Sequence, residues 1–378
     1  MANVLFTDDD RRFMARALKL AKRGQFSTQP NPRVGCVVVN GGKVVGEGFH
    51  EKAGQAHAEV NALAEAREHA QGATVYVSLE PCSHTGRTPP CTAQLIEAGV
   101  TRVIYATNDS NPQVGGNGAL QLEAAGVEVQ GGLMAAEARI LNRGFFHRHE
   151  LGRPFVTVKL ATTLDGKIGL KSGQSKWITG EDARADVQRL RARSCAIVTG
   201  SGTVRADNPE MIVRDQSLTT LGRQPQVVVL DTNLSLSSEY KIFSTAAKCS
   251  VVYVQENLNN ARELAQQGVR LYQVAEQIGE QSIGNDKRVD LRETLRWLAA
   301  EQCNEILLEA GPELASAFIA SDLWDEIIVY MAPKLIGSSG KEGFPLPPIH
   351  ELADAKNLEF TDVRFVGSDL RIKLTASH

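Results

Sequence analysis

The residues best suited to chemistry lie in one stretch near the amino end of the chain. Glu59 follows His57 by two positions, and Cys82 and Cys91 each follow a proline. One imidazole and two thiolates suit Zn²⁺ and leave a fourth tetrahedral position for water, as catalytic zinc sites require. Zinc lowers the pKa of that water, and Glu59, kept off the metal, can carry the proton to a leaving nitrogen. The pattern predicts a zinc-dependent deaminase, whose usual signature is His-x-Glu followed by Pro-Cys-x-x-Cys.

A structural zinc site is the alternative to a catalytic one. Such a site normally closes with four protein ligands, and His84 lies between the two cysteines as a candidate fourth. Two features argue against a structural site with four protein ligands. Glu59 lies beside His57 at the start of an expected helix, and the surrounding sequence is typical of a ligand-binding site. Eight residues, Ser83 to Pro90, separate the cysteines where the usual signature has two. This longer loop requires its own explanation.

The composition is that of a soluble globular protein with two domains. The chain has 378 residues, too many for one ordinary core, and a formal charge of −3 without a basic run. These features argue against a nucleic acid as the main partner. No apolar run approaches the roughly 18 residues of a membrane span, and Met1 to Asp10 is polar and acidic, so we expect neither a membrane span nor secretion. We expect a cytoplasmic protein that acts on small molecules, and the composition leaves open whether it forms a homo-oligomer.

The six cysteines are too few for a disulfide framework. Two of them belong to the proposed metal site. The other four are most simply buried thiols of a reducing compartment. They are Cys36, Cys195, Cys249 and Cys303.

Strand and helix patterns alternate on both sides of a junction at Gly152-Arg153-Pro154. This predicts an α/β fold in two domains, 1–150 and 151–378, with the metal ligands at strand and helix ends of the first. The polar stretch 255–290 is expected to form surface structure with little chemistry. Strands are expected over 34–39, 43–49, 74–79, 101–107, near 127, and over 155–160, 195–199, 226–230, 249–254, 305–309 and 326–330; helices are expected over 8–24, 57–69, 92–98, 118–125, from 135, and over 181–192 and 291–302.

Three segments of the first domain form one recognisable set: Pro30 to Gly35, the run Gly46 to Val60 that ends in His57-Ala58-Glu59-Val60, and the run Leu79 to Cys91. Together they resemble the deaminase domain of the bacterial bifunctional riboflavin-biosynthesis enzymes, including the eight-residue cysteine spacing. The resemblance implies a cytidine-deaminase-like three-layer domain, with zinc held by His57, Cys82 and Cys91.

The resemblance also implies substrate contacts in the deaminase domain. Asn31 and His50 match positions that contact the pyrimidine ring, although Asn31 also suits a turn and His50 a satisfied buried histidine. The long cysteine loop places His84 and Arg87 beside the zinc. Arg87 would supply a cation for a substrate phosphate, or would be an ordinary solvated loop charge.

Segments of the second domain include Val158 to Ala161, Leu164 to Ile168, Ser175 to Thr179, Gly200 to Pro209 and Glu309 to Leu314. They resemble the reductase domain of the same enzymes, which implies a dihydrofolate-reductase-like fold and NADPH as cofactor. No Gly-x-Gly-x-x-Gly follows a first strand, so a Rossmann site is not indicated. The cofactor phosphates are expected at two glycine-bearing turns, 200–203 and 311–314, where helices begin.

The resemblance assigns the reductase residues to two sides of one site. Asp207 also suits a turn and Trp177 a core position, so both keep a structural alternative. Ala310 replaces a glycine that is usual in the family, and its methyl group could crowd the cofactor. The NADPH side comprises Ala161, Trp177, Thr203, Asp207, Gly311, Pro312, Glu313 and Leu314; the substrate side comprises Lys159, Ser175, Arg191, Met211, Arg214 and Glu309.

The expected function therefore has two steps. The first is deamination of 2,5-diamino-6-ribosylamino-4(3H)-pyrimidinone 5′-phosphate. The second is reduction by NADPH of the ribosyl group of 5-amino-6-(5-phosphoribosylamino)uracil to a ribityl chain. A nucleoside or nucleic-acid deaminase with an unrelated fusion would favour short cysteine spacing or a basic surface. A zinc-stabilised binding module without catalysis would be favoured by loss of Glu59, which is present.

Overall fold

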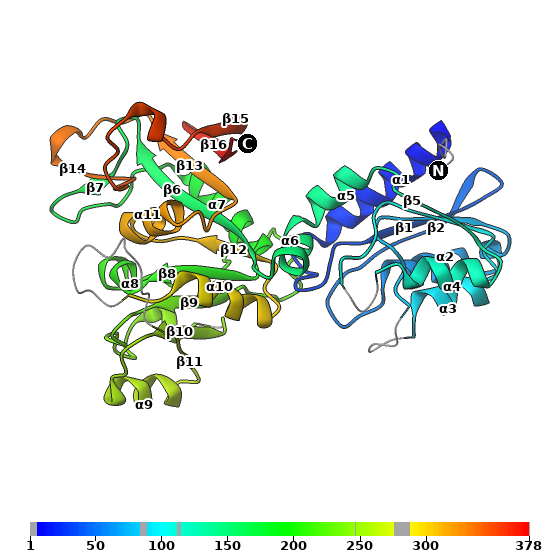
Figure 1. The fold of residues 1–378 in the computed structure, drawn as a ribbon, viewed down its shortest axis with the longest axis horizontal. Coiled ribbons are helices and arrows are strands. Elements are labelled where there is room, and N and C mark those ends of the chain that lie inside the picture. Colours follow the sequence, from blue (N-terminus) through cyan, green and yellow to red (C-terminus); the bar gives the residue numbers. More distant parts are fainter. Residues whose placement is uncertain (1–5, 84–88, 112–114, 246, 276–287, 378) are drawn as a thin grey trace. The chain divides into compact units, whose positions relative to one another are not determined.

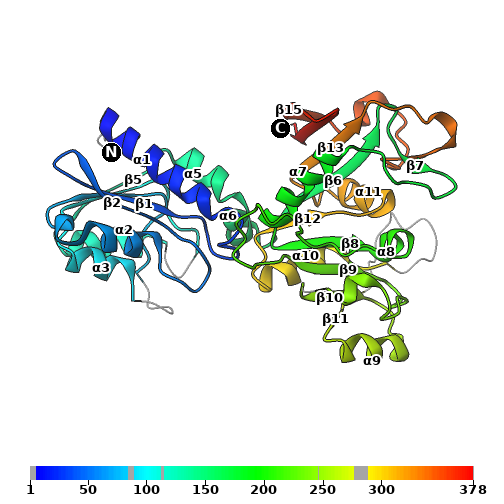
Figure 2. The same cartoon turned by 180° about the vertical axis from the view of Figure 1, so that it is seen from behind.

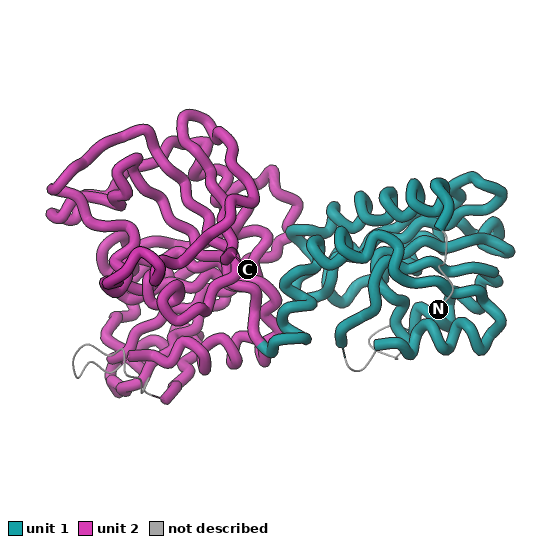
Figure 3. Tube along the Cα trace, turned by 45° about the horizontal axis from the view of Figure 1, so that its top comes forward, with its two compact units in different colours: residues 1–152 teal, residues 153–378 magenta. Residues whose placement is uncertain are grey.

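The protein forms two compact units, Met1–Gly152 and Arg153–His378, coloured teal and magenta in Figure 3. The structure, a computed structural model, describes residues 6–83, 89–111, 115–245, 247–275 and 288–377. Each unit has its own sheet and its own hydrophobic cores. Within the described ranges, no helix combines the length and apolar character needed to cross a membrane.

Unit 1 is built on a five-stranded sheet with the strand order β2-β1-β3-β4-β5. Strand β1 pairs antiparallel with β2 and β3, whereas β3, β4 and β5 run parallel. The carboxyl ends of the parallel strands therefore lie along one edge of the sheet. The strands are β1 Gly35–Asn40, β2 Lys43–Phe49, β3 Thr74–Val77, β4 Arg102–Tyr105 and β5 Glu128–Gly131.

Helices cover both faces of this sheet, as Figures 1 and 2 show from opposite sides. On one face Met14 of α1 shares a core with Val37, and on the other Ala62 of α2 shares a second core with Val38. Adjacent residues of β1 enter different cores because strand side chains alternate between faces. The predicted three-layer domain is confirmed. The helices are α1 Asp8–Ala21, α2 Ala58–Ala66, α3 Cys91–Glu97, α4 Asn117–Ala124, α5 Ala135–Leu141 and α6 Arg143–Leu151.

Local sequence explains where the first and last helices of unit 1 begin and end. Helix α1 starts with a capping box: the Thr7 hydroxyl accepts from Asp10 N at 3.1 Å, and the Asp10 carboxylate accepts from Thr7 N at 2.9 Å. Helix α6 ends at Gly152, whose φ of 67° is a left-handed conformation that glycine adopts without strain. The chain leaves unit 1 at this residue.

Unit 2 contains a nine-stranded sheet in the order β11-β10-β9-β8-β12-β6-β13-β16-β15. Strands β11 through β13 in this order are parallel, and β16 and β15 add an antiparallel hairpin at one edge. Strands β7 and β14 form a separate pair. The strands are β6 Phe155–Thr163, β7 Lys167–Leu170, β8 Ala196–Gly200, β9 Gln226–Leu230, β10 Cys249–Tyr253, β11 Arg270–Gln273, β12 Glu305–Leu308, β13 Glu326–Ala332, β14 Gly340–Glu342, β15 Leu358–Val366 and β16 Asp369–Ala376.

Helices also lie on both faces of the large sheet. Phe318 of α11 shares a core with Val198, whereas Leu264 of α9 shares another with Ile197, the preceding residue of β8. The carboxyl ends of β9, β8, β12 and β6 are neighbours at one edge, and the loops that follow them build the site described below. The helices are α7 Glu181–Arg193, α8 Ser201–Asp207, α9 Leu258–Gln266, α10 Leu291–Ala300 and α11 Pro312–Ala320.

Two candidate active sites

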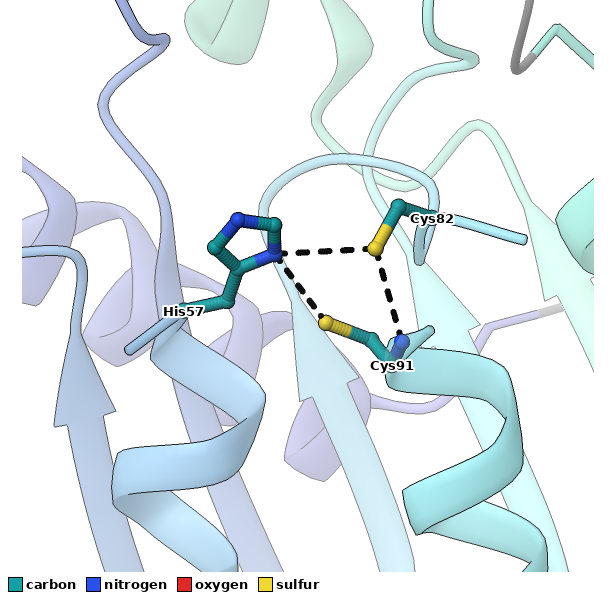
Figure 4. A group of neighbouring side chains, drawn as sticks. All are labelled: His57, Cys82 and Cys91. Carbon is teal, nitrogen blue, oxygen red and sulfur yellow. Dashed lines mark hydrogen bonds between the residues drawn. The ribbon is translucent and has the colours of Figure 1, made fainter. Parts of the chain in front are cut away.

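The three expected zinc ligands converge in unit 1 from separate elements (Figure 4). His57 is the N-cap of α2, Cys91 is the first residue of α3, and Cys82 follows β3. Nδ1 of His57 lies 3.2 Å from Sγ of Cys91 and 3.6 Å from Sγ of Cys82. All three ligand atoms lie within 4.8 Å of one another. One tetrahedral zinc ion, with bonds of about 2.0–2.3 Å, fits such a set.

The electrostatics of the two thiols suit metal binding. The backbone N–H of Cys91 donates to Sγ of Cys82 at 3.4 Å. The Cys91 thiol also interacts with Cys82, and this hydrogen bond lowers the pKa of Cys82 well below its usual value. The donor set therefore includes a ready thiolate, the form of cysteine that binds metals.

Glu59 lies in the first turn of α2, two residues after His57. Its side chain is buried, and burial raises the pKa of its carboxyl to about 6. The carboxyl also interacts with the Cys91 thiol, which places it beside the ligand set. A carboxyl that titrates close to neutral pH is suited to take up and release a proton.

Asn31 and His50 are joined beside the metal ligands. The amide Nδ2 of Asn31 donates to Nε2 of His50 at 3.1 Å, and Nδ1 of His50 donates to the carbonyl of Ala56 at 3.0 Å. The rings of His50 and His57 meet edge to face with centroids 5.4 Å apart. Burial lowers the pKa of His50, consistent with a neutral ring. Both ring nitrogens of His50 are thus engaged within the protein, and the amide oxygen of Asn31 is left for another donor.

Glu80 is a buried residue to which the sequence assigned no role. Its carboxylate accepts the backbone N–H of Asp109 at 3.2 Å, Gly116 at 3.1 Å, Gly118 at 3.1 Å and Ala119 at 3.4 Å. It therefore fastens the start of α4 to the segment that carries Cys82. No sequence signal indicated this contact, because its partners lie about 30 to 40 residues away.

Two deaminase residues expected from the sequence, His84 and Arg87, fall in the range 84–88, outside the described residues.

In unit 2, one cavity of about 1440 Å³ gathers all the reductase residues expected from the sequence. It opens at the edge where β6, β12, β8 and β9 end. Its lining includes, from the sequence-based set, Lys159, Ala161, Ser175, Trp177, Arg191, Thr203, Asp207, Met211, Arg214, Glu309, Gly311, Pro312, Glu313 and Leu314.

A buried charge cluster forms one side of this cavity. Arg191 of α7 binds Glu309 with two hydrogen bonds, Nε to Oε1 at 2.6 Å and Nη2 to Oε2 at 2.9 Å. Arg191 also donates to the carbonyl of Ile212 at 3.1 Å. Burial opposes the charge of Glu309, but Arg191 and Lys159 of β6 outweigh it and lower its pKa. Burial lowers the pKa of Lys159, against the attraction of Glu309.

The two glycine-bearing turns lie against each other, as the sequence led us to expect. The Thr203 hydroxyl accepts the backbone N–H of Gly311 at 2.9 Å and so ties the start of α8 to the start of α11. A Cβ added at Gly202 would meet no atom within 4 Å, so space remains beside this turn. The open glycine turns and the size of the cavity fit a dinucleotide such as NADPH.

The other reductase residues predicted from the sequence differ in their exposure to solvent and in their contacts. Trp177 is 64% exposed beneath the Arg184 guanidinium, which lies 4.4 Å from the ring centroid, so a core role is excluded. Arg214 has a side chain that is 64% exposed and lies 3.5 Å from Glu210. Ala310 lines the cavity yet packs against the core below it. Arg184, which lies over the Trp177 ring and lines the cavity, was not among the residues predicted from the sequence.

Comparison with known proteins assigns each unit to a family. The family model for the cytidine and deoxycytidylate deaminase zinc-binding region matches residues 7–107, and the model for the RibD C-terminal domain matches residues 154–372. The riboflavin biosynthesis protein RibD of Escherichia coli is 45% identical over 377 residues, covering 97% of this chain and 100% of that protein. The RibD of Haemophilus influenzae is 43% identical, covering 98% of each chain.

Solved structures give the same result for the fold. A structure of Acinetobacter baumannii RibD has a TM-score of 0.89 and 41% identity, covering 98% of this chain and 99% of its own. A structure of the diaminohydroxyphosphoribosylaminopyrimidine deaminase/5-amino-6-(5-phosphoribosylamino)uracil reductase of Thermotoga maritima has a TM-score of 0.83 and 32% identity, with the same coverage. The expected fold, with a deaminase-like first domain and a reductase second domain, is confirmed. The chain belongs to the RibD family, the bifunctional deaminases and reductases of riboflavin biosynthesis.

Proposed function

We propose that unit 1 deaminates 2,5-diamino-6-ribosylamino-4(3H)-pyrimidinone 5′-phosphate and that unit 2 reduces the ribosyl group of the product with NADPH. The name of the Thermotoga maritima relative carries both activities. The observation that carries the proposal is the pairing of a His57, Cys82 and Cys91 ligand set in one unit with a large charged cavity in the other. The domains are then 1–150 for deamination and 151–378 for reduction.

In the deaminase site, His57, Cys82 and Cys91 would hold a zinc ion, which would supply an activated water. Glu59 would carry a proton to the leaving amino group, since its carboxyl lies beside the ligands and is not one of them. His50 fixes the orientation of Asn31, whose amide oxygen then accepts a hydrogen bond from the pyrimidine ring. His84 and Arg87 of the long cysteine loop bind the phosphate.

In the reductase site, the two turns joined by Thr203 hold the cofactor, and the charged side of the cavity holds the substrate. NADPH supplies the hydride when bound. Arg191 holds Glu309 in one orientation through two hydrogen bonds, and Lys159 lies close enough to stabilise the same carboxylate. The exposed Arg214 is suited to the sugar phosphate. The remaining members of the set assigned from the sequence, such as Ser175 and Met211, shape the substrate side.

Replacing Cys82 with serine should remove most of the zinc, because a hydroxyl is a poor ligand for this ion. Elemental analysis of the purified protein measures the metal content. Cys195→Ser, the same change in unit 2, should leave zinc content unaltered. Full retention of zinc by Cys82→Ser would show that the ligand set is wrong.

Arg214→Ala should weaken binding of the reductase substrate by about 1.5 kcal/mol, or roughly tenfold in KM. This is the lower end for a hydrogen bond to a charged group, because water already competes at this exposed side chain. Steady-state oxidation of NADPH with the deaminated substrate measures the effect. Ammonia release should be unchanged, since distant sites without shared partners act independently. Arg262→Ala on the surface helix α9 is the control, and an equal effect there would refute the substrate role.

A further inference from the structure

One face of helix α7 lines the cavity of unit 2, and the middle residue of that face is Gln188. Arg184, Gln188 and Arg191 are spaced four and three residues apart, so their side chains lie on one side of the helix. All three residues line the cavity. Arg184 contacts the Trp177 ring, and Arg191 is paired with Glu309. Gln188 lies between these two contacts, one helical turn from each arginine.

The side-chain amide of Gln188 is held in one orientation by the backbone. Its Oε1 accepts the backbone N–H of Arg214 at 2.7 Å. A backbone N–H can only donate, so the amide oxygen must face Arg214 and the NH₂ group must lie on the other side. Within the described ranges, Nε2 of Gln188 forms no hydrogen bond. A half-buried side chain at the cavity wall thus presents two N–H donors for a ligand.

Two further side chains hold the segment 211–214 that lies beside Gln188. Gln224 binds both backbone groups of Val213: its Oε1 accepts the N–H at 2.8 Å and its Nε2 donates to the carbonyl at 2.9 Å. Arg191 donates to the carbonyl of Ile212 at 3.1 Å. Gln188 lines the cavity, whereas Gln224 does not. Gln224 is therefore a matched glutamine that holds the same segment without facing a ligand.

The charged groups beside Gln188 suit other partners. Arg191 is paired with Glu309, and the exposed Arg214 is suited to the sugar phosphate. A phosphate is bound best by cations of this kind. The amide of Gln188 is neutral, and its donors match a neutral carbonyl oxygen in an ordinary hydrogen bond. The ligand group that fits Gln188 is therefore a carbonyl of the pyrimidine ring.

The pyrimidine that unit 2 would receive differs at C2 from the one that unit 1 would receive. Deamination replaces the 2-amino group, a hydrogen-bond donor, with a carbonyl oxygen, an acceptor. The sugar phosphate and the 4-carbonyl are the same in both compounds. A fixed N–H donor binds the 2-carbonyl oxygen, but opposite a 2-amino group both donors would be left without a partner. A site built to hydrogen-bond its substrate rejects an analogue that cannot form the bond by large factors.

We propose that Gln188 donates an Nε2–H hydrogen bond to the 2-carbonyl oxygen of the uracil ring and so makes unit 2 select the deaminated compound over the 2-amino compound. The proposal rests on the reductase function proposed above for this cavity. It gives a chemical reason for the order of the two steps, because the group that Gln188 binds does not exist before deamination.

The test compares NADPH oxidation with the two pyrimidines in full-length chains that cannot deaminate. Glu59→Gln is the common background, and a parallel ammonia assay checks that the 2-amino compound stays intact. In this background kcat/KM should be at least about 100-fold higher for the deaminated compound. Adding Gln188→Ala should lower kcat/KM for the deaminated compound about tenfold and leave that for the 2-amino compound unchanged. Adding Gln188→Glu, which keeps an acceptor for Arg214 and replaces the NH₂ donor with a second acceptor, should raise kcat/KM for the 2-amino compound.

Gln224→Ala in the same background is the matched control. It loosens the segment 211–214 without removing a group from the cavity wall, so its effect on kcat/KM should be equal for the two compounds and leave their ratio unchanged. Denaturation followed by tryptophan fluorescence shows that each variant is folded in unit 2.

The outcomes separate this proposal from the reductase assignment. An equal fall for both compounds in Gln188→Ala overturns the proposal, because the contact would then be with a group that the compounds share, such as the phosphate or the 4-carbonyl. No change for either compound also overturns it. A loss of selectivity in Gln224→Ala as large as in Gln188→Ala would assign the effect to the segment 211–214 and overturn the proposal as well. Failure of the background chain to oxidise NADPH with the deaminated compound would overturn the reductase assignment itself, and this proposal with it.

Discussion

Glu59→Gln is expected to lower deamination by about 10²- to 10⁴-fold while zinc stays bound. The amide keeps the size of the side chain but cannot take up and return a proton, and general acid–base catalysis is commonly worth this factor. Burial already holds the pKa of Glu59 at about 6, so the wild-type carboxyl can exchange its proton near neutral pH. Ammonia release measures the rate, and elemental analysis measures the metal.

The matched control is Glu68→Gln, the same change at an exposed position after α2. It should alter neither rate nor metal content. Loss of zinc together with activity in Glu59→Gln would identify Glu59 as a ligand. Near-normal ammonia release would remove it from catalysis.

Glu309→Gln is expected to destabilise unit 2 by about 3 kcal/mol and to abolish reduction. The change leaves Arg191 without its carboxylate in a place where only 12% of the arginine side chain and 9% of the Glu309 side chain are exposed. Breaking a buried ion pair from one side typically costs 3–5 kcal/mol, because the remaining charge stays buried. The three tryptophans of the chain, at 177, 297 and 324, all lie in unit 2. Tryptophan fluorescence during denaturation therefore reports the stability of this unit alone.

The difference from wild type should also depend on pH. The folded state lowers the pKa of Glu309, so its stabilising contribution is present above the ordinary carboxyl pKa and is lost as pH falls through the folded value. The stability gap between Glu309→Gln and wild type should therefore narrow in acid. Glu301→Gln, which breaks an exposed pair with Arg270, should cost less than about 1 kcal/mol. A gap that stays constant down to the acid limit would contradict the ion-pair explanation.

The sequence singled out His57, Cys82 and Cys91, which the structure brings together, because these residue types are rare and their roles are specific. Histidine and cysteine at this spacing have few roles other than zinc binding, and the apolar patterns marked the strand before Cys82 and the helices that begin at His57 and Cys91. The contact of Glu80 with the loop before α4 could not be predicted. A glutamate that binds distant backbone N–H groups has the same local sequence as one exposed to solvent.

Unit 2 was less predictable where elements lack a clear apolar pattern. The stretch 255–290 contains α9 and β11, and its last described part includes Arg288, which lines the cavity. The hairpin β15–β16 was also missed, because β15 is an edge strand with most residues exposed. Arg205 of α8 donates to the hydroxyls of Ser201 and Ser235, and Ser235 lies 30 residues away along the chain. Sequence spacing alone gives no information about such a contact.

The most direct measurement of the two-step account supplies 2,5-diamino-6-ribosylamino-4(3H)-pyrimidinone 5′-phosphate to the intact protein with and without NADPH. Ammonia and oxidised cofactor are followed together. Ammonia should appear at the same rate in both cases, and NADPH should be consumed only after a lag in which the deaminated product forms. Consumption of NADPH without prior ammonia release, or ammonia release that requires NADPH, would contradict two successive reactions at two separate sites.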